Sequence, residues 1–141
     1  MVKTPKTYGA VDLGTNNCRL LIAQPSGEGF RVITSYSRIV RLGEGLLRNE
    51  CLSDSAMNRT IQALRICSEK LAKFNVVRSR SIATEACRRA KNCHEFFSKI
   101  KRDTSLSMEI ITSYEEACLA LRGCQNLLNS NQPYALVFDI H

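Results

Sequence analysis

Short apolar runs, separated by polar turn residues, follow one another along the first forty residues in the pattern of β-strands joined by turns. Strands are expected at residues 8–12, 19–24 and 30–40. The third contains successive β-branched side chains at 32–34, which favour extended backbone. Turn-forming residues at 25–29 separate the last two strands, and Gly43 and Gly45 follow the third. Because these connections are short, we expect an antiparallel three-stranded meander.

From residue 54 onwards, the apolar spacing changes to the intervals of three and four residues that are typical of an amphipathic helix. Residues 54–74 predict one helix, whose apolar face carries Met57, Ile61, Leu64, Cys67, Leu71 and Phe74. Ser53 precedes this helix and is predicted to cap it. An apolar stretch at 76–83 then predicts a fourth strand.

Helices and strands continue to alternate to the end of the chain. We expect a helical turn at 85–90, a helix from 92, a strand at 106–112, a helix at 113–128 and a strand at 134–140. Asn92 with Glu95, and Ser113 with Glu116, have the spacing of a capping box. The last strand is almost entirely apolar, which predicts burial on both faces. A meander followed by this alternation predicts an α/β fold with a mixed sheet flanked by helices.

The turn between the first two predicted strands has the composition of a phosphate-binding loop. Asp12 ends the strand, where a carboxylate can hold a metal ion or a water molecule. Glycine lets backbone approach a ligand closely, and small polar residues can direct N–H groups at an anion. The candidates for phosphate contact are Gly14, Thr15, Asn16 and Asn17. An ordinary hairpin with a polar tip fits the same residues equally well.

The composition of the chain limits the classes of protein to which it can belong. The chain has 141 residues, 44% of them hydrophobic, which is enough for one domain with a real core. No apolar stretch reaches the roughly 18 residues of a membrane span, and no secretory signal is visible, so we expect a cytoplasmic protein. The seven cysteines are odd in number and form no CxxC pair. We therefore expect buried free thiols rather than a zinc site or a disulfide framework.

The net charge of +7 is concentrated in residues 59–102, which contain twelve Lys or Arg residues but only three Glu residues. Such an excess favours a polyanionic partner, either nucleic acid or a phosphorylated substrate. A solvated helix face explains the same residues about as well. Few aromatic residues and no helix-turn-helix or RNP-like pattern make nucleic acid the less favoured partner.

Five segments in order resemble motifs of the Ppx/GppA family of exopolyphosphatases and guanosine-pentaphosphate phosphohydrolases. They lie at residues 11–20, 41–46, 83–90, 113–117 and 137–140, so the resemblance extends over nearly the whole chain. It implies an actin-like fold made of two ribonuclease-H-like lobes. It also implies cleavage of the terminal phosphoanhydride of polyphosphate or guanosine pentaphosphate, with Mg²⁺ and water.

The resemblance assigns roles to individual residues. Glu116 corresponds to the family's proposed general base, and Arg88 to an arginine near the transferring phosphate. Asp12 and Asp139 become the candidate Mg²⁺ ligands, because both end an apolar strand in the same way. From the residues alone, Glu116 is better explained as the glutamate of a capping box, which stabilises the first turn of a helix.

The resemblance also implies that residues 1–128 form the first lobe, while 129–141 form a loop and the first strand of a truncated second lobe. His141 stands where family members begin a glycine triplet. We therefore expect an N-terminal fragment that is inactive alone and that self-associates through exposed apolar surface. The alternative is a non-catalytic lobe that binds polyphosphate or nucleotide, or a decayed remnant. The choice between polyphosphate and guanosine pentaphosphate stays open.

Overall fold

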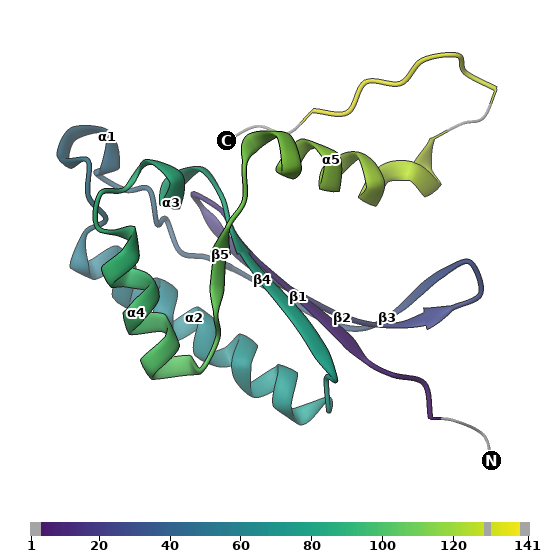
Figure 1. The fold of residues 1–141 in the computed structure, drawn as a ribbon, viewed down its shortest axis with the longest axis horizontal. Helices are drawn as coiled ribbons and strands as arrows, with labels where there is room; N and C mark the ends of the chain where they lie inside the picture. The colour runs from purple at the N-terminus through teal and green to yellow at the C-terminus, as the bar shows by residue number, and fades with distance from the viewer. Residues whose placement is uncertain (1–3, 129–130, 139–141) are drawn as a thin grey trace.

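A five-stranded mixed sheet forms the centre of the protein (Figure 1). The computed structural model describes residues 4–128 and 131–138. The strands are β1 (Tyr8–Leu13), β2 (Asn17–Ser26), β3 (Gly29–Ile39), β4 (Arg78–Ala83) and β5 (Met108–Ile110). Their spatial order is β3-β2-β1-β4-β5, with β2 antiparallel to both of its neighbours and with β1, β4 and β5 mutually parallel. The predicted α/β fold and its opening meander are therefore confirmed.

The helices alternate with the later strands, as the apolar spacing predicts. They are α1 (Leu46–Asn49), α2 (Asp54–Lys73), α3 (Glu85–Arg89), α4 (Cys93–Thr104) and α5 (Ser113–Cys124), which continues into a 3-10 turn, Gln125–Leu127. The Ser53 side chain accepts a hydrogen bond from the Ala56 amide, which confirms it as the cap of α2. The short helix α1 has no clear signal in the sequence.

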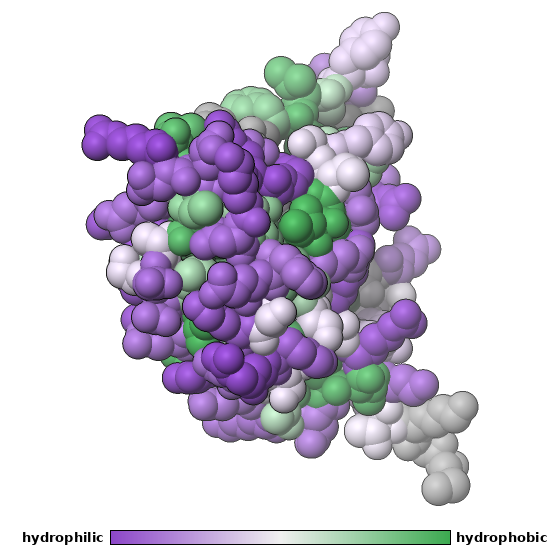
Figure 2. Space-filling model, turned by 60° about the vertical axis from the view of Figure 1, so that its left-hand side comes forward, coloured by the Kyte–Doolittle hydropathy of each residue, from purple (hydrophilic) through white to green (hydrophobic). Residues whose placement is uncertain are grey.

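Helices α2 and α4 lie on the same side of the sheet (Figure 1), and the core fills the space between. Alternate residues of the central strands point into it, such as Val11 and Leu13 of β1 and Ile22 of β2. Leu64 of α2 and Phe96 of α4 are fully buried against them. Each such side chain stabilises the fold by about 1.5–3 kcal/mol. The outward side of these helices is mostly hydrophilic (Figure 2).

Four of the seven cysteines are buried: Cys18, Cys67, Cys87 and Cys93. The Sγ atoms of Cys18 and Cys67 lie 4.0 Å apart, between β2 and α2. This contact and burial both raise the pKa of Cys18, which keeps it a neutral thiol at physiological pH. These cysteines therefore pack as small apolar residues, as predicted. No helix in the described part of the chain is both long and apolar enough to cross a membrane.

Two predicted caps are wrong in detail. Asn92 precedes α4 but makes no capping bond. Its side-chain amide instead accepts from the Leu52 amide at 2.8 Å and donates to the Leu52 carbonyl at 2.9 Å. The cap of α5 is Thr112, whose hydroxyl accepts from Glu115 N, rather than Ser113. The capping pattern is therefore displaced by one residue from the predicted pair.

The strand predicted at 134–140 is not found over its described residues. Residues 134–138 belong to neither a helix nor a strand. Their large side chains are exposed, at 91% for Tyr134, 85% for Leu136 and 74% for Phe138. A strand needs a hydrogen-bonded neighbour and its apolar side chains need a cover, and the described residues supply neither to this segment. Its last residues, including Asp139, lie outside the described part of the chain.

The two hydrogen bonds between the Asn92 side chain and the Leu52 backbone predict that a substitution of Asn92 lowers the free energy of unfolding. Leu52 is 3% exposed, so Asn92→Ala leaves a buried backbone amide without its partner. Such a loss costs about 1–3 kcal/mol. We expect urea denaturation to show a destabilisation of about 2 kcal/mol. Ser113→Ala is the control and should change stability by less than about 0.5 kcal/mol. Equal effects of the two substitutions would contradict this assignment.

The exposed side chains at 134–138 predict self-association. Apolar side chains in water favour contacts that cover them. We expect the sedimentation coefficient to rise with protein concentration, and to stop rising in the double variant Leu136→Ser, Phe138→Ser. Leu47→Ser, which removes an isolated exposed leucine of α1, should leave the association unchanged. A wild-type chain that sediments as a monomer at all concentrations would exclude this expectation.

Candidate active site

Three of the segments that carry predicted site residues meet at one edge of the sheet. Because β1, β4 and β5 are parallel, their carboxyl ends lie side by side. Thr84 N donates to Leu13 O at 3.1 Å, and Ile111 N donates to Ala83 O at 3.2 Å. These bonds align the chain that follows each strand. Ligands in open α/β sheets bind at this kind of edge.

The first segment is the turn at residues 14–17, between β1 and β2. Gly14 N donates to Asn17 O at 2.9 Å and closes the turn, so all four candidate phosphate-binding residues lie together. The predicted strand-turn-strand is confirmed. Whether the turn holds phosphate stays a prediction.

Residues 40–45, which follow β3, form backbone hydrogen bonds with this turn. Val40 N and Arg41 N both donate to Asn16 O, at 2.8 and 3.0 Å, and Gly43 N donates to Thr15 O at 3.0 Å. A Cβ atom on Gly43 would lie 2.4 Å from Thr15 Cγ2, so only glycine fits this approach. The Thr15 and Asn16 carbonyl groups therefore already accept hydrogen bonds from the amides of residues 40–45.

The Thr15 hydroxyl is a polar group left to be satisfied. Its Oγ1 is buried and has no hydrogen-bond partner among the described residues. A buried hydroxyl without a partner costs about 1–3 kcal/mol. An anion or a water molecule at the turn would offset this cost.

The second and third segments bring the predicted catalytic pair into contact. Arg88 lies in α3, after β4, and Glu116 lies in the first turn of α5, after β5. Arg88 Nη2 donates to Glu116 Oε2 at 2.8 Å, and the two side chains are only 17% and 15% exposed. Two residues that are 28 positions apart therefore form a half-buried ion pair at the carboxyl edge of the sheet.

Further contacts fix the Arg88 guanidinium. Its Nη1 donates to Ile111 O at 2.8 Å, and its Nε and Nη2 donate to Glu85 Oε2 at 3.3 and 3.1 Å. Desolvation lowers the pKa of Arg88, but hydrogen bonds to Glu116 and Glu85 outweigh it and raise that pKa overall. Arg88 is thus a permanent, oriented cation.

The displaced cap of α5 changes the position of Glu116 in the helix from the one predicted. Since Thr112 is the cap, the position that a capping box would use belongs to Glu115. Glu116 lies one residue further and turns its carboxylate to Arg88. Glu116 is therefore not the glutamate of a capping box, although it still lies among the acidic residues of the first turn of α5, and its role as general base stays a prediction.

Asp12 lies on the face of the sheet opposite the core. Its neighbours Val11 and Leu13 are buried among α2 and α4, so the alternation of the strand turns Asp12 the other way. It pairs in register with Arg19 of β2, and both line a hollow of about 360 Å³ together with Ser35 and Ser37 of β3. This hollow offers charged and hydroxyl groups near the turn.

The predicted metal site rests on Asp12 and Asp139, of which only Asp12 is described. Within residues 4–128 and 131–138, no three His, Cys, Asp or Glu side chains gather as metal ligands. Mg²⁺ commonly takes one or two carboxylates and completes its shell with water and substrate phosphates. Asp12 fits that need as one ligand, and the Mg²⁺ site stays a prediction.

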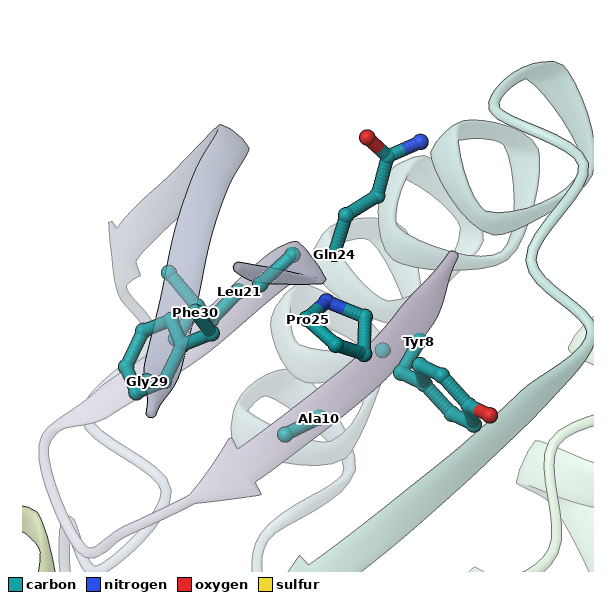
Figure 3. Close-up of a pocket in the computed structure, with 9 residues that line it drawn as sticks. Tyr8, Ala10, Leu21, Gln24, Pro25, Gly29 and Phe30 are labelled. Atoms are coloured by element: carbon teal, nitrogen blue, oxygen red, sulfur yellow. The ribbon is translucent and has the colours of Figure 1, made fainter. Parts of the chain in front are cut away.

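A second hollow, of about 290 Å³, lies on the same sheet but at the other end of its strands (Figure 3). Tyr8 begins β1, Gln24 and Pro25 lie near the end of β2, and Phe30 is the second residue of β3. The lining is mainly apolar, and Phe30 is 61% exposed. An apolar lining of this kind does not suit a polyanion.

The basic segment at 59–102 does not form one open positive surface. Most of its cations pair with carboxylates, including Arg65 with Asp103, Lys91 with Glu50, and Arg80 with both Glu109 and Glu115. Solvated ion pairs across the helices explain much of this charge. Arg88 is the cation of this segment that binds Glu116 at the carboxyl edge of the sheet, and its neighbour Arg89 pairs with Glu85.

Sequence reasoning missed two parts of this site. Glu85 holds Arg88, and the spacing of three residues on a short helix could have indicated that pair. The support of the turn by residues 40–45 was not predicted either: the family motif at 41–46 marked this segment, but no periodic pattern joins it to the turn.

Comparison with known structures defines the class of fold first. The ethanolamine utilization protein EutJ of Carboxydothermus hydrogenoformans matches 86% of this chain and 41% of its own, with a TM-score of 0.51 and 16% identity. That likeness concerns the fold alone. The open mixed sheet with its meander is the lobe of an actin-like ATPase fold.

Closer matches define the family. The family model described as "Ppx/GppA phosphatase family" matches residues 21–141, and the chain belongs to that family. A Ppx/GppA protein of Aquifex aeolicus is 32% identical, with a TM-score of 0.81, over 86% of this chain and 40% of that one. An exopolyphosphatase-like protein is 31% identical, with a TM-score of 0.84, over 92% of this chain and 39% of that one.

An exopolyphosphatase from Cytophaga hutchinsonii is also similar, at 27% identity and a TM-score of 0.81, over 86% of this chain and 39% of that one. The chain thus spans about 40% of the length of these solved relatives. The resemblance drawn from the five sequence segments is confirmed as family membership.

The contact between Gly43 and Thr15 predicts that a substitution at position 43 destabilises the protein and that a second substitution at position 15 restores its stability. Gly43→Ala places a methyl group against Thr15 Cγ2, which we expect to destabilise the protein by about 1–3 kcal/mol in urea denaturation. Adding Thr15→Ser removes that methyl group while keeping the hydroxyl, and should restore most of the loss. Gly29→Ala, where nothing lies within 4 Å, is the neutral control. Full stability of Gly43→Ala alone would disprove the close approach.

Proposed function

We propose that this chain takes part in hydrolysing the terminal phosphoanhydride bond of polyphosphate or guanosine pentaphosphate. The observation that carries this proposal is the 2.8 Å contact between Arg88 and Glu116, at the same edge of the sheet as the 14–17 turn. Family membership supports it, since a similar solved protein is named an exopolyphosphatase. A cation and a carboxylate held together beside a polar turn suit phosphoryl transfer to water.

In the proposed reaction, a water molecule attacks the terminal phosphorus and the bridging P–O bond of the anhydride breaks. Glu116 accepts the proton of that water, and the shortened phosphate chain departs with the electron pair of the broken bond. General base catalysis of this kind contributes about 10²–10⁴-fold in rate. Arg88 donates its N–H groups to phosphate oxygens and offsets the charge that develops on them.

The 14–17 turn is the proposed cradle for the phosphate that reacts. Gly14 lets the backbone approach an anion, while Thr15, Asn16 and Asn17 supply small polar donors. Asp12 and Asp139 are the proposed ligands of Mg²⁺, which would offset the negative charge of the substrate when bound.

A second function, without catalysis, is supported by the Thr15 hydroxyl of the 14–17 turn. Its Oγ1 is buried and has no hydrogen-bond partner among the described residues. A bound anion near this hydroxyl would offset the cost of leaving it unpaired, and no general base is needed for that. In this case the lobe binds polyphosphate or nucleotide and releases no orthophosphate.

Glu116→Gln tests the catalytic proposal. This substitution keeps the size of the side chain and its contact with Arg88, but removes the base. In the presence of Mg²⁺, we expect orthophosphate release from polyphosphate to fall at least about 100-fold. Calorimetric affinity for polyphosphate should remain within about threefold. Glu115→Gln, on the same helical turn, is the matched control and should keep both. Unchanged turnover in Glu116→Gln would remove Glu116 as the base.

The same measurements distinguish the two functions. A chain that binds polyphosphate, with an affinity that falls as salt rises, but releases no orthophosphate acts as a binding lobe. Parallel titrations with guanosine pentaphosphate identify the preferred phosphate compound. A chain that binds neither compound contradicts both functions.

A further inference from the structure

Arg59 joins α2 to the segment that supports the 14–17 turn. Its Nε donates to Val40 O at 3.0 Å, and its Nη2 donates to Arg41 O at 3.4 Å and to Glu44 Oε2 at 2.7 Å. One guanidinium thus binds two backbone carbonyls and one carboxylate within residues 40–45. These partners lie 15 to 19 positions earlier in the chain.

The supporting segment is held in an unusual conformation. Arg41 has a φ of 48°, in the left-handed region that residues other than glycine seldom adopt. Its amide donates to Asn16 O, and its carbonyl accepts from Glu44 N at 3.1 Å as well as from Arg59. Such a conformation persists only where the surrounding contacts fix it. Arg59 is one of those contacts.

We propose that Arg59 is a positioning residue for the phosphate-binding turn. Arg59 fixes residues 40–45, and those residues bind Thr15 O and Asn16 O, so the shape of the turn depends on a side chain that lies outside it. This role rests on the proposed function, because a preset turn serves catalysis only if the turn holds phosphate. The residue acts through the backbone of 40–45 rather than on the substrate.

The chemistry of arginine explains why this position needs its planar fork. A guanidinium reaches several acceptors in fixed directions, whereas a lysine ammonium is a single point charge on a flexible stem. Lysine at position 59 keeps the positive charge but cannot hold both carbonyls and the Glu44 carboxylate at once. Arg59→Lys therefore separates geometry from charge.

Arg65 provides the matched control. It lies on the same helix, and its ion pair with Asp103 joins α2 to α4 rather than to residues 40–45. Arg65→Gln and Arg59→Gln change the net charge equally. If Arg59→Gln changes hydrogen exchange or binding more than Arg65→Gln does, the difference comes from the contacts of Arg59 and not from the lost charge.

Hydrogen exchange of the backbone amides tests the proposal without any ligand. The amides of Val40, Arg41 and Gly43 donate to the turn. We expect them to exchange about tenfold faster in Arg59→Gln and in Arg59→Lys, and within about twofold of wild type in Arg65→Gln. Glu44→Ala, which removes one of the three acceptors of Arg59, should give a smaller acceleration. Wild-type exchange in Arg59→Gln overturns the proposal, whatever the protein binds.

Calorimetric titration with tripolyphosphate measures whether the same variants bind phosphate more weakly. We expect Arg59→Gln and Arg59→Lys to weaken binding about five- to tenfold, and Arg65→Gln to weaken it less than about twofold. Wild-type affinity in Arg59→Lys, with equal losses in the two glutamine variants, would show an effect of charge alone and overturn the proposal. A wild-type chain that binds no tripolyphosphate contradicts the proposed function, while the exchange rates still decide the role of Arg59.

Discussion

The hydrogen-bonded ladder of β1 is the constraint on which the rest of the site depends. β1 lies at the centre of the sheet, antiparallel to β2 and parallel to β4. Its antiparallel neighbour forces the chain into the tight 14–17 turn. Its parallel neighbour brings the end of β4, and with it α3, to the same edge. A slip of one residue in either register would turn Asp12 into the core and Val11 out of it.

The electrostatics of the edge follow from that alignment. Arg88 is surrounded by the carboxylates of Glu85 and Glu116 and by the Ile111 carbonyl, so its charge is partly balanced before any ligand arrives. An isolated guanidinium that is only 17% exposed would be unfavourable, and these partners make its burial tolerable. The surrounding basic residues pair with carboxylates of their own at the surface. The edge therefore combines one oriented cation with a nearby carboxylate rather than a broad positive field.

The core and the order of elements could be predicted because they depend on local periodicity. Apolar runs separated by turn residues predicted the strands of the meander, and helical spacing placed Leu64 on the buried side of α2. The contact between Arg88 and Glu116 needed more, because no local pattern joins residues 28 positions apart. Family motifs selected both residues, and only the parallel pairing of β4 with β5 explains why they meet.

Other features depended on choices that the sequence leaves open. Thr112 and Ser113 can each cap a helix, and the point where the chain leaves β5 selects the first. The Asn92 amide can satisfy a local helix end or a distant backbone, and it binds Leu52 instead. Residues 134–138 have a strand's composition, but a strand forms only beside a partner. The contacts of Arg59 join irregular backbone to a helix, for which sequence patterns carry no periodic signal.

The exposed position of α5 has a mechanical consequence. None of its described residues is buried, and its two ion pairs with the rest of the protein, Glu115 with Arg80 and Glu116 with Arg88, both lie in its first turn. With a rise of about 1.5 Å per residue, Glu116 lies about 6 Å along the axis from Thr112, and Cys124 about 18 Å. Tilting the helix about its cap therefore moves the outer end about three times as far as the carboxylate. A contact on the outer half of α5 therefore displaces the Glu116 carboxylate by only about a third of the movement of that outer end.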